Sequence, residues 1–278
     1  MYSRKMNLKD IGRKFLIKTI GGRLKYQGFF EMLFLISCHG MNIGGLGDVG
    51  DSGESLVLKN IRNKIKNKPV YIFDVGANQG NYSLMVLDIF KGVDLNLFSF
   101  EPSNFTFKIL KKKLGKNNSN LFNFGLGEKE ESRILFTTEK GLGLASLYQR
   151  NLEEYNMKMD IKEEVNIQTL DNFCKKNKIK KIDLLKIDVE GHEFSVLKGA
   201  EKMINSDSID YIQFEFGCNY DSKTYFKDFF YLLNPRYEIY RILKDGLYPI
   251  KEYKWTNEIF NAINYLAINR KTKLSKNE

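Results

Sequence analysis

From residue 70 onward, short apolar runs alternate with stretches in which apolar residues recur at helical spacing. This alternation is typical of an α/β domain, in which helices cover a mostly parallel sheet. The segments predicted to be strands are 70–75, 95–100, 120–125, 182–188 and 211–216, followed by a hairpin-like pair at 237–243 and 263–269. The segments predicted to be helices within the same region are 82–90, 105–114 and 193–204.

The first 55 residues lack this alternation and are predicted to form a helical extension. Apolar residues recur there at helical spacing, notably Ile11, Phe15 and Ile20, which indicates one or two amphipathic helices. A loop with five glycines follows these helices. We therefore divide the chain into an N-terminal helical extension with its glycine-rich loop, residues 1–55, and an α/β domain, residues 56–278.

A further helix is predicted to begin at the stretch "DSGE", just before the α/β pattern. Asp51 can cap this helix, and the side chain of Glu54 can reach back to the Asp51 amide in a box-like arrangement. The helix should run through Val57 and Ile61 and end before Pro69.

Basic residues are concentrated in the first predicted helix: Arg4, Lys5, Lys9, Arg13, Lys14 and Lys18. We favour packing of this helix on the main domain, because most amphipathic helices cover a core. The alternative is peripheral contact of residues 1–36 with an anionic membrane surface.

The net charge of +10 and the pI near 9.2 suggest a nucleic-acid partner only weakly, because the lysines are scattered. The three cysteines are far apart and lack CxxC spacing, which argues against a disulfide framework or a zinc site. The apolar run at 29–36 contains Glu31 and is too short to span a bilayer. We expect a cytoplasmic protein without a nucleic-acid partner, peripheral at the inner membrane face if the membrane alternative holds.

A glycine-containing loop follows the first predicted strand of the α/β domain, in the sequence "FDVGANQG". Gly76 and Gly80 allow a ligand to approach the backbone closely, and the next helix offers free amides. The middle glycine of a dinucleotide-binding GxGxxG motif is absent, so a pyrophosphate is not the expected ligand. Asp74 ahead of the loop instead suits a ligand that carries an ammonium and a sulfonium.

The second strand ends in "FEP", which places Glu101 at the strand tip, 21 positions after Gly80. A carboxylate at this position can accept hydrogen bonds from both hydroxyls of a ribose. The glycine loop alone is compatible with an ordinary strand-to-helix turn. Together with Glu101 it indicates a nucleoside ligand.

These segments, with "TLDNFCKKNKIKKIDLLKIDVEGHEFSVLKGA", resemble the FkbM family of S-adenosylmethionine (SAM)-dependent methyltransferases from about residue 70 onward. The stretch "GMNIGGLGDVGDSGE" is similar to a lead-in of members associated with surface polysaccharide genes. The resemblance implies a class I methyltransferase (Rossmann-like) fold, with a seven-stranded, mostly parallel sheet between helices on both faces. It implies the strand order 3-2-1-4-5-7-6 with the last strand antiparallel, and methylation of a hydroxyl on a sugar or another secondary metabolite.

The resemblance also implies which residues contact SAM. Asp74, Gly76 and Gly80 would surround the methionine end, with Ala77 and Asn78 between them, and Glu101 would bind the ribose. The rim of the ribose and adenine site would comprise Pro102, Asn104, Leu126 and Glu128. The family often has Asp where this chain has Glu128.

The stretch "LLKIDVEGHE" forms the tip of the fourth strand, where the reacting end of a ligand is expected in such a sheet. Asp188 is our candidate for the catalytic site and for a cofactor contact, although capping of the next helix is compatible with both. Lys186 lies inside the strand and needs a carboxylate partner, for which Asp74 and Glu215 on the flanking strands are candidates. A buried structural ion pair is the simpler interpretation of Lys186.

Two further assignments concern the same strand tips. Asp188 and Glu215 could together hold Mg²⁺, which would acidify an acceptor hydroxyl. His192 has an unperturbed pKa of about 6.5 and is a candidate general base, although a substrate contact or a packing role fits equally well.

The function predicted from the sequence is a SAM-dependent O-methyltransferase that acts on a saccharide, a glycolipid or a related secondary metabolite in polysaccharide biosynthesis. One alternative is a nucleic-acid methyltransferase, but "IDVEGHE" lacks the polar–Pro–Pro–aromatic tip expected for base-amine methylation. Another alternative is a non-catalytic SAM-binding subunit of a glycan-assembly complex. The acceptor and the oligomeric state stay open.

Overall fold

The computed structural model describes residues 8–44, 52–65, 68–115, 120–138, 145–150, 152, 157–217 and 220–272. The chain divides into two compact units, Met1–Gly44 and Gly45–Glu278. Within the described ranges, no helix combines the length and the apolar composition needed to cross a membrane.

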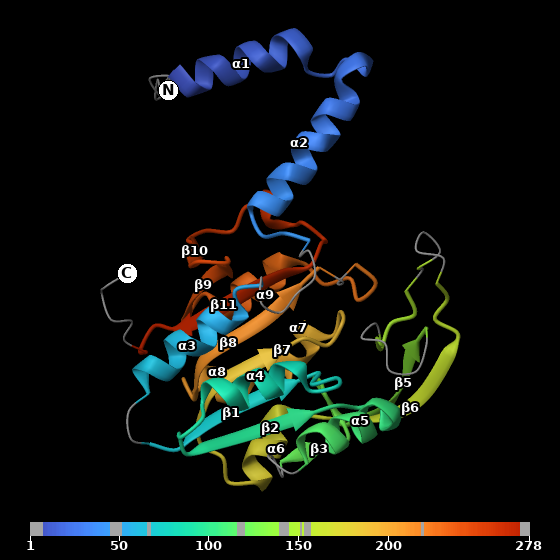
Figure 1. Cartoon of the computed structure of the whole chain (residues 1–278), viewed down its shortest axis with the longest axis vertical. Coiled ribbons are helices and arrows are strands. Elements are labelled where there is room, and N and C mark those ends of the chain that lie inside the picture. The colour runs from blue at the N-terminus through green and yellow to red at the C-terminus, as the bar shows by residue number, and fades with distance from the viewer. Residues whose placement is uncertain are drawn as a thin grey trace. The chain divides into compact units, whose positions relative to one another are not determined.

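The N-terminal unit consists of helices α1 (Leu8–Ile20) and α2 (Gln27–Gly40), separated by the 3-10 turn η1 (Leu24–Tyr26) (Figure 1). One or two helices were predicted in this segment, and the structure has two. Gly22 lies in the connection between α1 and η1, and its positive φ of 69° suits a residue without a β-carbon. The predicted packing of these helices on the main domain stays a prediction.

The second unit is built on an eight-stranded sheet whose order is β10-β9-β11-β8-β7-β1-β2-β3. Its strands are β1 (Val70–Val75), β2 (Leu95–Phe100), β3 (Leu121–Phe122), β7 (Ile182–Ile187), β8 (Ile209–Phe216), β9 (Tyr237–Ile242), β10 (Leu247–Ile250) and β11 (Ile263–Asn269). Strands β1, β2, β3, β7 and β8 are parallel, and β11 is antiparallel to both β8 and β9. This arrangement confirms the predicted class I methyltransferase fold and its order 3-2-1-4-5-7-6.

The sheet has one strand more than predicted. β10 pairs antiparallel with β9 at the edge of the sheet. It is only four residues long and contains Pro249, which cannot donate to a central ladder but is tolerated at an edge. A short segment with this composition does not register as a strand in a sequence pattern.

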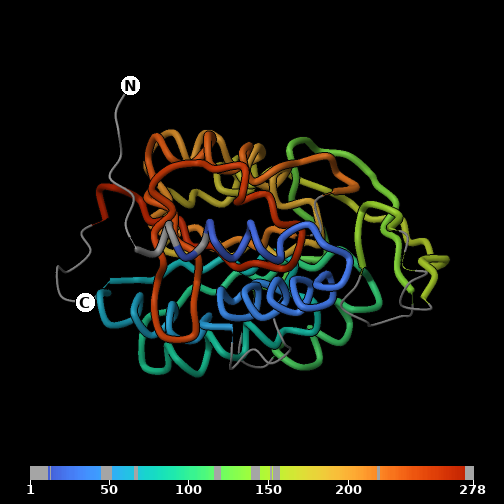
Figure 2. Tube along the Cα trace, turned by 90° about the horizontal axis from the view of Figure 1, so that it is seen from above, coloured from blue at the N-terminus to red at the C-terminus, as the bar shows by residue number. Residues whose placement is uncertain are grey.

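A second, three-stranded sheet was not predicted. It has the order β4-β6-β5 and consists of β4 (Gly125–Leu126), β5 (Glu131–Thr137) and β6 (Ile161–Gln168). It lies at one side of the domain in both Figure 1 and Figure 2. The predicted strand at 120–125 is therefore wrong as a single element, because the chain leaves the main sheet after β3 and joins the small sheet at β4.

Helices cover both faces of the main sheet. On one face, α3 (Glu54–Lys64) and α4 (Asn81–Ile89) bury Ile61 and Val86 against Ile72 and Leu184 of the sheet, and α5 (Asn104–Leu114) packs beside α4. On the other face lie α6 (Leu170–Lys176) and α9 (Phe226–Leu233), as well as α7 (Glu193–Lys198) and α8 (Glu201–Asn205).

Aromatic rings fill much of the second face. Phe173 of α6 lies edge-on to Phe100 and Phe122, with ring centroids 5.0 Å and 4.9 Å away. Phe229 of α9 stacks on Phe214 of β8 at 5.0 Å. Edge-to-face and stacked aromatic pairs of this kind stabilise a core beyond the area that they bury.

The predicted helices at 82–90 and 105–114 correspond to α4 and α5. The predicted helix at 193–204 is wrong as one continuous element, because it is divided into α7 and α8. The carbonyl of Gly199 accepts a hydrogen bond from the Asp171 amide at 3.0 Å, so a contact with α6 interrupts the helix.

Helix α3 confirms the predicted helix through Val57 and Ile61, both of which are buried. The proposed capping residue Asp51 lies outside the described residues. Gly53 precedes the helix with a positive φ of 84°, and the hydroxyl of Ser52 donates to the Glu54 carboxylate at 3.0 Å.

Candidate active site

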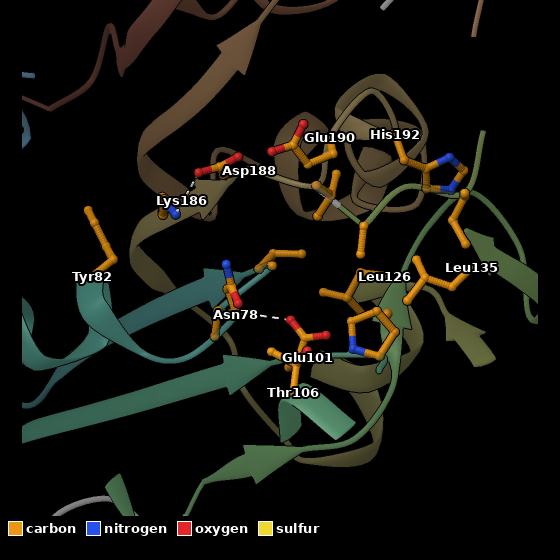
Figure 3. A pocket seen from close by; sticks show the side chains of 18 of the residues that line it. Asn78, Tyr82, Glu101, Thr106, Leu126, Leu135, Lys186, Asp188, Glu190 and His192 are labelled. Atoms are coloured by element: carbon orange, nitrogen blue, oxygen red, sulfur yellow. Dashed lines mark hydrogen bonds and ion pairs between the residues drawn. The ribbon is translucent and has the colours of Figure 1, made fainter. Parts of the chain in front are cut away.

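A cavity of about 290 Å³ opens at the carboxyl ends of β1, β2 and β7, and the small sheet closes one side of it (Figure 3). Its lining combines carboxylates, one lysine, backbone of the loop after β1, and an apolar wall. The lining residues are Glu54, Val75–Gln79, Asn81, Tyr82, Glu101, Pro102, Thr106, Gly125, Leu126, Leu135, Ala145, Leu147, Ile167, Lys186, Asp188–Glu190 and His192.

Glu101 lies at the tip of β2 and faces the cavity (Figure 3). Its Oε2 accepts a hydrogen bond from the Asn78 amide at 3.0 Å, and its Oε1 accepts one from the Ser103 amide at 2.9 Å. Burial raises the pKa of Glu101 to about 7, although the two amides act in the opposite direction. Each carboxylate oxygen retains capacity for one more donor, as recognition of a diol requires.

Gly76 directly follows β1 and lies against the backbone of Asp188, which directly follows β7. Its φ is 82°, and a β-carbon at this position would overlap the carbonyl oxygen of Asp188. The Asp188 amide in turn donates to the Val75 carbonyl at 3.0 Å. Glycine is thus required here both by the backbone conformation and by the close approach of the second strand.

Lys186 of β7 is 5% exposed and lies between two carboxylates. Its Nζ is 3.2 Å from Asp188 Oδ2 and 3.6 Å from Asp74 Oδ1, and it lies over the ring of Tyr82 at 4.7 Å from the centroid. Burial by itself lowers the pKa of Lys186, but the charges of Asp188 and Asp74 outweigh it and raise the pKa. Of the two carboxylates predicted as candidate partners of Lys186, Asp74 and Glu215, Asp74 forms an ion pair with it, and Asp188 is a partner that was not predicted.

Asp74 is fully buried and lies behind the cavity wall, outside the lining. Its Oδ2 accepts a hydrogen bond from Ser83 of α4 at 2.6 Å, and Ser83 is 2.8 Å from the Ser99 hydroxyl. In this structure, the carboxylate therefore holds Lys186 and α4 in place.

Glu54 of α3 lines the cavity, although the sequence suggested no site role for it. Its Oε1 accepts a hydrogen bond from Gln213 Nε2 at 2.6 Å, and the Tyr82 hydroxyl donates to Gln213 Oε1 at 3.4 Å. Burial raises the pKa of Glu54. Its signals in the sequence were its position at a helix start and its place at the end of the stretch "GMNIGGLGDVGDSGE", and neither indicated a role in the site.

Asp188 is the more accessible carboxylate of the β7 tip, with 39% of its side chain exposed. The neighbouring Glu190 has a positive φ of 55° and pairs with Arg150 at 3.0 Å. Glu215 does not line the cavity, and burial, followed by the charges of Asp188 and Glu190, raises its pKa well above its ordinary value.

The predicted Mg²⁺ site at Asp188 and Glu215 is not supported. In the described part of the chain, no group of three or more His, Cys, Asp or Glu side chains is arranged to hold a metal ion. The strong rise in the pKa of Glu215 disfavours a second ionised carboxylate beside Asp188.

His192 lines the cavity but is only 5% exposed. Its Nδ1 is 3.0 Å from the Tyr148 hydroxyl, and its Nε2 lies where a β-carbon on Gly127 would come within 2.8 Å. Burial, followed by the charge of Arg133, lowers the pKa of His192 to about 4. A histidine in this environment is neutral at pH 7 and a weak base.

The remaining predicted contacts divide into two groups. Gly76, Ala77, Asn78, Pro102 and Leu126 line the cavity. Gly80, Asn104 and Glu128 do not: Gly80 caps α4 with a φ of 85°, the Asn104 amide donates to Glu163 at 2.6 Å, and the Glu128 amide donates to Ser195 at 3.1 Å.

Several lining residues were not assigned to the site from the sequence. Leu135 and Ile167 come from the small sheet, and Ala145 and Leu147 come from the connection between its strands β5 and β6. The hydroxyl of Ser146 fixes this segment by donating to the Glu190 carbonyl at 2.6 Å. The apolar run at 134–136 in β5 and the apolar residues Val165 and Ile167 on one face of β6 were the available signal for this wall.

Comparison with known proteins places these observations in a family. Residues 74–241 match the model described as the methyltransferase FkbM domain. No curated protein matches the chain.

Three solved structures are similar to this chain at low sequence identity. Methyltransferase FkbM from Methylobacillus flagellatus KT has 15% identity and a TM-score of 0.44, over 73% of this chain and 45% of that chain. The O-methyltransferase from Bacillus cereus in complex with SAH has 9% identity and a TM-score of 0.43, over 93% and 97% of the two chains. Aeropyrum pernix fibrillarin with bound S-adenosyl-L-methionine has 12% identity and a TM-score of 0.40, over 79% and 76%. The match thus spans less than half the length of the Methylobacillus protein.

Proposed function

The chain belongs to the FkbM methyltransferase family, and from this membership we propose that it transfers the methyl group of SAM to a hydroxyl of a saccharide, a glycolipid or a related secondary metabolite. The proposed setting is polysaccharide biosynthesis. The observation that carries the proposal is the position of Asp188. Its carboxylate, at the tip of β7, and the carboxylate of Glu101, at the tip of β2, line the same cavity (Figure 3).

The residues of the cavity fit SAM as the methyl donor. Glu101 offers two oxygens with unused acceptor capacity, which suits the paired hydroxyls of a ribose. Leu126, Leu135 and Ile167 form an apolar wall suited to the adenine ring. The backbone of Gly76–Asn78 faces the cavity, so polar groups at the methionine end can approach it closely. When bound, SAM supplies a methyl group activated by its positively charged sulfur.

The acceptor hydroxyl must lose its proton when it becomes a methyl ether, and Asp188 is positioned to accept that proton. Lys186 Nζ donates a hydrogen bond to its Oδ2 at 3.2 Å, which helps to orient the carboxylate in the cavity lining. Holding a reacting hydroxyl in line, together with proton acceptance, is the contribution that the chain itself makes to such a transfer.

His192 is a weaker candidate for the base. It is nearly inaccessible, its Nδ1 already contacts Tyr148, and its pKa is lowered to about 4. A packing role beside the cavity accounts for these observations.

The proposal is tested by incubating the purified protein with deuterium-labelled SAM and extracted sugar nucleotides and glycolipids, followed by mass spectrometry. The expected product is a glycan that carries one labelled methyl group and withstands mild alkali, as an ether does and an ester does not. SAM binding without transfer to any glycan would contradict the proposal and favour a non-catalytic subunit. Transfer to added RNA or DNA instead would indicate the nucleic-acid alternative.

A further inference from the structure

The N-terminal unit exposes an unusual amount of apolar surface. Among the described residues, nine of the eighteen exposed large hydrophobic side chains lie in α1, η1 and α2. They are Phe15, Leu16, Ile17, Leu24, Phe29, Met32, Phe34, Leu35 and Ile36, with exposed fractions from 43% to 92%. We call these nine side chains the N-terminal apolar surface.

Helix α2 is apolar around most of its circumference. Its sequence, "QGFFEMLFLISCHG", contains one acidic residue, Glu31. The consecutive residues Phe34, Leu35 and Ile36 are all more than half exposed, and consecutive residues of a helix point about 100° apart. A helix that is apolar all round is normally buried in a core or in lipid.

The length of α2 limits how lipid could surround it. With 14 residues it is about 21 Å long, at about 1.5 Å per residue. The hydrocarbon core of a bilayer is about 30 Å thick, so α2 fits the boundary between headgroups and acyl chains and does not fit a span.

The charge of the unit favours an anionic partner. Residues 1–44 contain eight Lys and Arg against two acidic residues, so they carry +6 of the net charge of +10. Lys14, Lys18, Arg23 and Lys25 are exposed in the same segment as the apolar surface. Two copies of this unit would repel each other, whereas anionic lipid headgroups would attract each copy.

We propose that the unit Leu8–Gly44 binds the surface of a membrane that contains anionic phospholipids. The apolar side chains of α2 enter the boundary between headgroups and acyl chains. Lys14, Lys18, Arg23 and Lys25 neutralise the phosphates around them. The proposal does not depend on the methyl-transfer reaction, because it rests on a different unit of the chain.

Co-sedimentation of the full-length protein with vesicles tests the proposal. We expect binding to vesicles of phosphatidylcholine and phosphatidylglycerol, much weaker binding to phosphatidylcholine alone, and a decrease in binding as the salt concentration rises. Lys14→Glu/Lys18→Glu should lower the partition coefficient about tenfold or more, since each basic residue near an anionic surface contributes measurably. Phe34→Ser/Leu35→Ser should lower it to a similar extent by removing apolar contacts.

Lys111→Glu/Lys112→Glu is the matched control. It makes the same change in net charge on exposed residues of α5, in the other unit, and should leave vesicle binding within about twofold of the unchanged protein. Circular dichroism of every variant shows whether it has folded.

Three results would overturn the proposal: no binding to the anionic vesicles, equal binding to neutral and anionic vesicles, or an equal loss of binding in the control variant. Light scattering provides a further test. A concentration-dependent dimer that Phe34→Ser/Leu35→Ser abolishes would assign the N-terminal apolar surface to a second copy of the chain instead.

Discussion

The ammonium of Lys186 lies 3.2 Å from the carboxylate of Asp188, so that a nearly inaccessible cation orients the more accessible carboxylate of the cavity. The same ammonium lies 3.6 Å from Asp74, which is fully buried. Lys186 therefore connects the interior of the sheet with the rim of the cavity. From its pair with Asp74 we expect an effect of mutation on stability, and from its pair with Asp188 an effect on turnover.

Removal of Lys186 should destabilise the fold. Lys186→Met leaves Asp74 buried without its cation, and breaking a buried pair from one side costs about 3–5 kcal/mol. Urea unfolding measures this loss of free energy. Asp74→Asn in the Lys186→Met background should recover part of it, because the unpaired charge is then gone.

Lys181→Met is the control for that experiment. Lys181 pairs with Asp210 at 3.0 Å, but its side chain is 51% exposed, so the loss should stay within about 1 kcal/mol. Equal losses for Lys181→Met and Lys186→Met would show that burial of the Lys186 pair has no special energetic weight.

Asp188→Asn should separate turnover from cofactor binding. Loss of a positioned proton acceptor typically costs about 10²–10⁴-fold in rate, while the affinity for SAM should change only a few-fold. The effect on turnover is measured as a single-turnover rate, with the glycan acceptor that mass spectrometry has identified. The effect on SAM affinity is measured by calorimetric titration. His192→Ala should reduce turnover less, and the opposite order would identify His192 as the base.

Gly76→Ala should be far more harmful than a substitution at a glycine of similar conformation. Gly92 has a φ of 80°, and among the described residues no atom lies within 4 Å of the place that a β-carbon would take there, whereas at Gly76 the carbonyl of Asp188 occupies that space. Gly92→Ala should cost only the conformational penalty of about 1–2 kcal/mol. Gly76→Ala should add roughly 1–3 kcal/mol of overpacking and weaken SAM binding. Thermal unfolding measures the stability of both variants, and SAM titration measures their affinity for SAM. Equal stabilities and equal affinities of the two variants would contradict the close contact at Gly76.

The affinity for SAM should rise as the pH increases through 7. Burial raises the pKa of Glu101 to about 7, so below this pH the carboxyl group is largely protonated and is a poorer acceptor for two hydroxyls. The stability of the free protein should change in the opposite direction. A group whose folded pKa is raised contributes stability below its unfolded pKa of about 4.5 that is lost as the pH rises through 7.

Two variants assign this pH dependence. Glu101→Gln should bind SAM weakly and with no dependence on pH between 6 and 8, roughly one pH unit on either side of the Glu101 pKa. Glu193 also has a pKa raised to about 7 by burial, but it does not line the cavity, so Glu193→Gln should retain the pH dependence of binding. Calorimetry at several pH values measures both, and a flat profile in the unchanged protein would contradict the assignment.

The sequence predicted those parts of the molecule that depend on neighbouring residues. The strand–loop–helix around Gly76, the carboxylate of Glu101 at a strand tip and the position of Lys186 inside an apolar strand are all local patterns, and each is confirmed in the fold. Because parallel strands bring their carboxyl ends to one edge, local patterns were sufficient to locate the cavity.

Other parts depended on contacts between distant segments. The interruption between α7 and α8 follows from a bond between Asp171 and Gly199, which are 28 positions apart. The hydrogen bond from Gln213 to Glu54 joins residues that are 159 positions apart, and the spacing of apolar residues in the two segments does not predict it. The wall formed by the small sheet was missed because its strands are half exposed and rich in charge.

The bond between Glu54 and Gln213 has a consequence for the smallest functional fragment. The family match begins at Asp74, yet α3 lies upstream of that position and supplies Glu54 to the cavity and Val57 and Ile61 to the core. A protein trimmed to the matched boundary would leave Gln213 Nε2 buried without its acceptor and would expose one face of the sheet. The boundary of the recognisable family segment and the boundary of the cooperative folding unit therefore differ, and any shortened version of this protein has to begin upstream of its family signature.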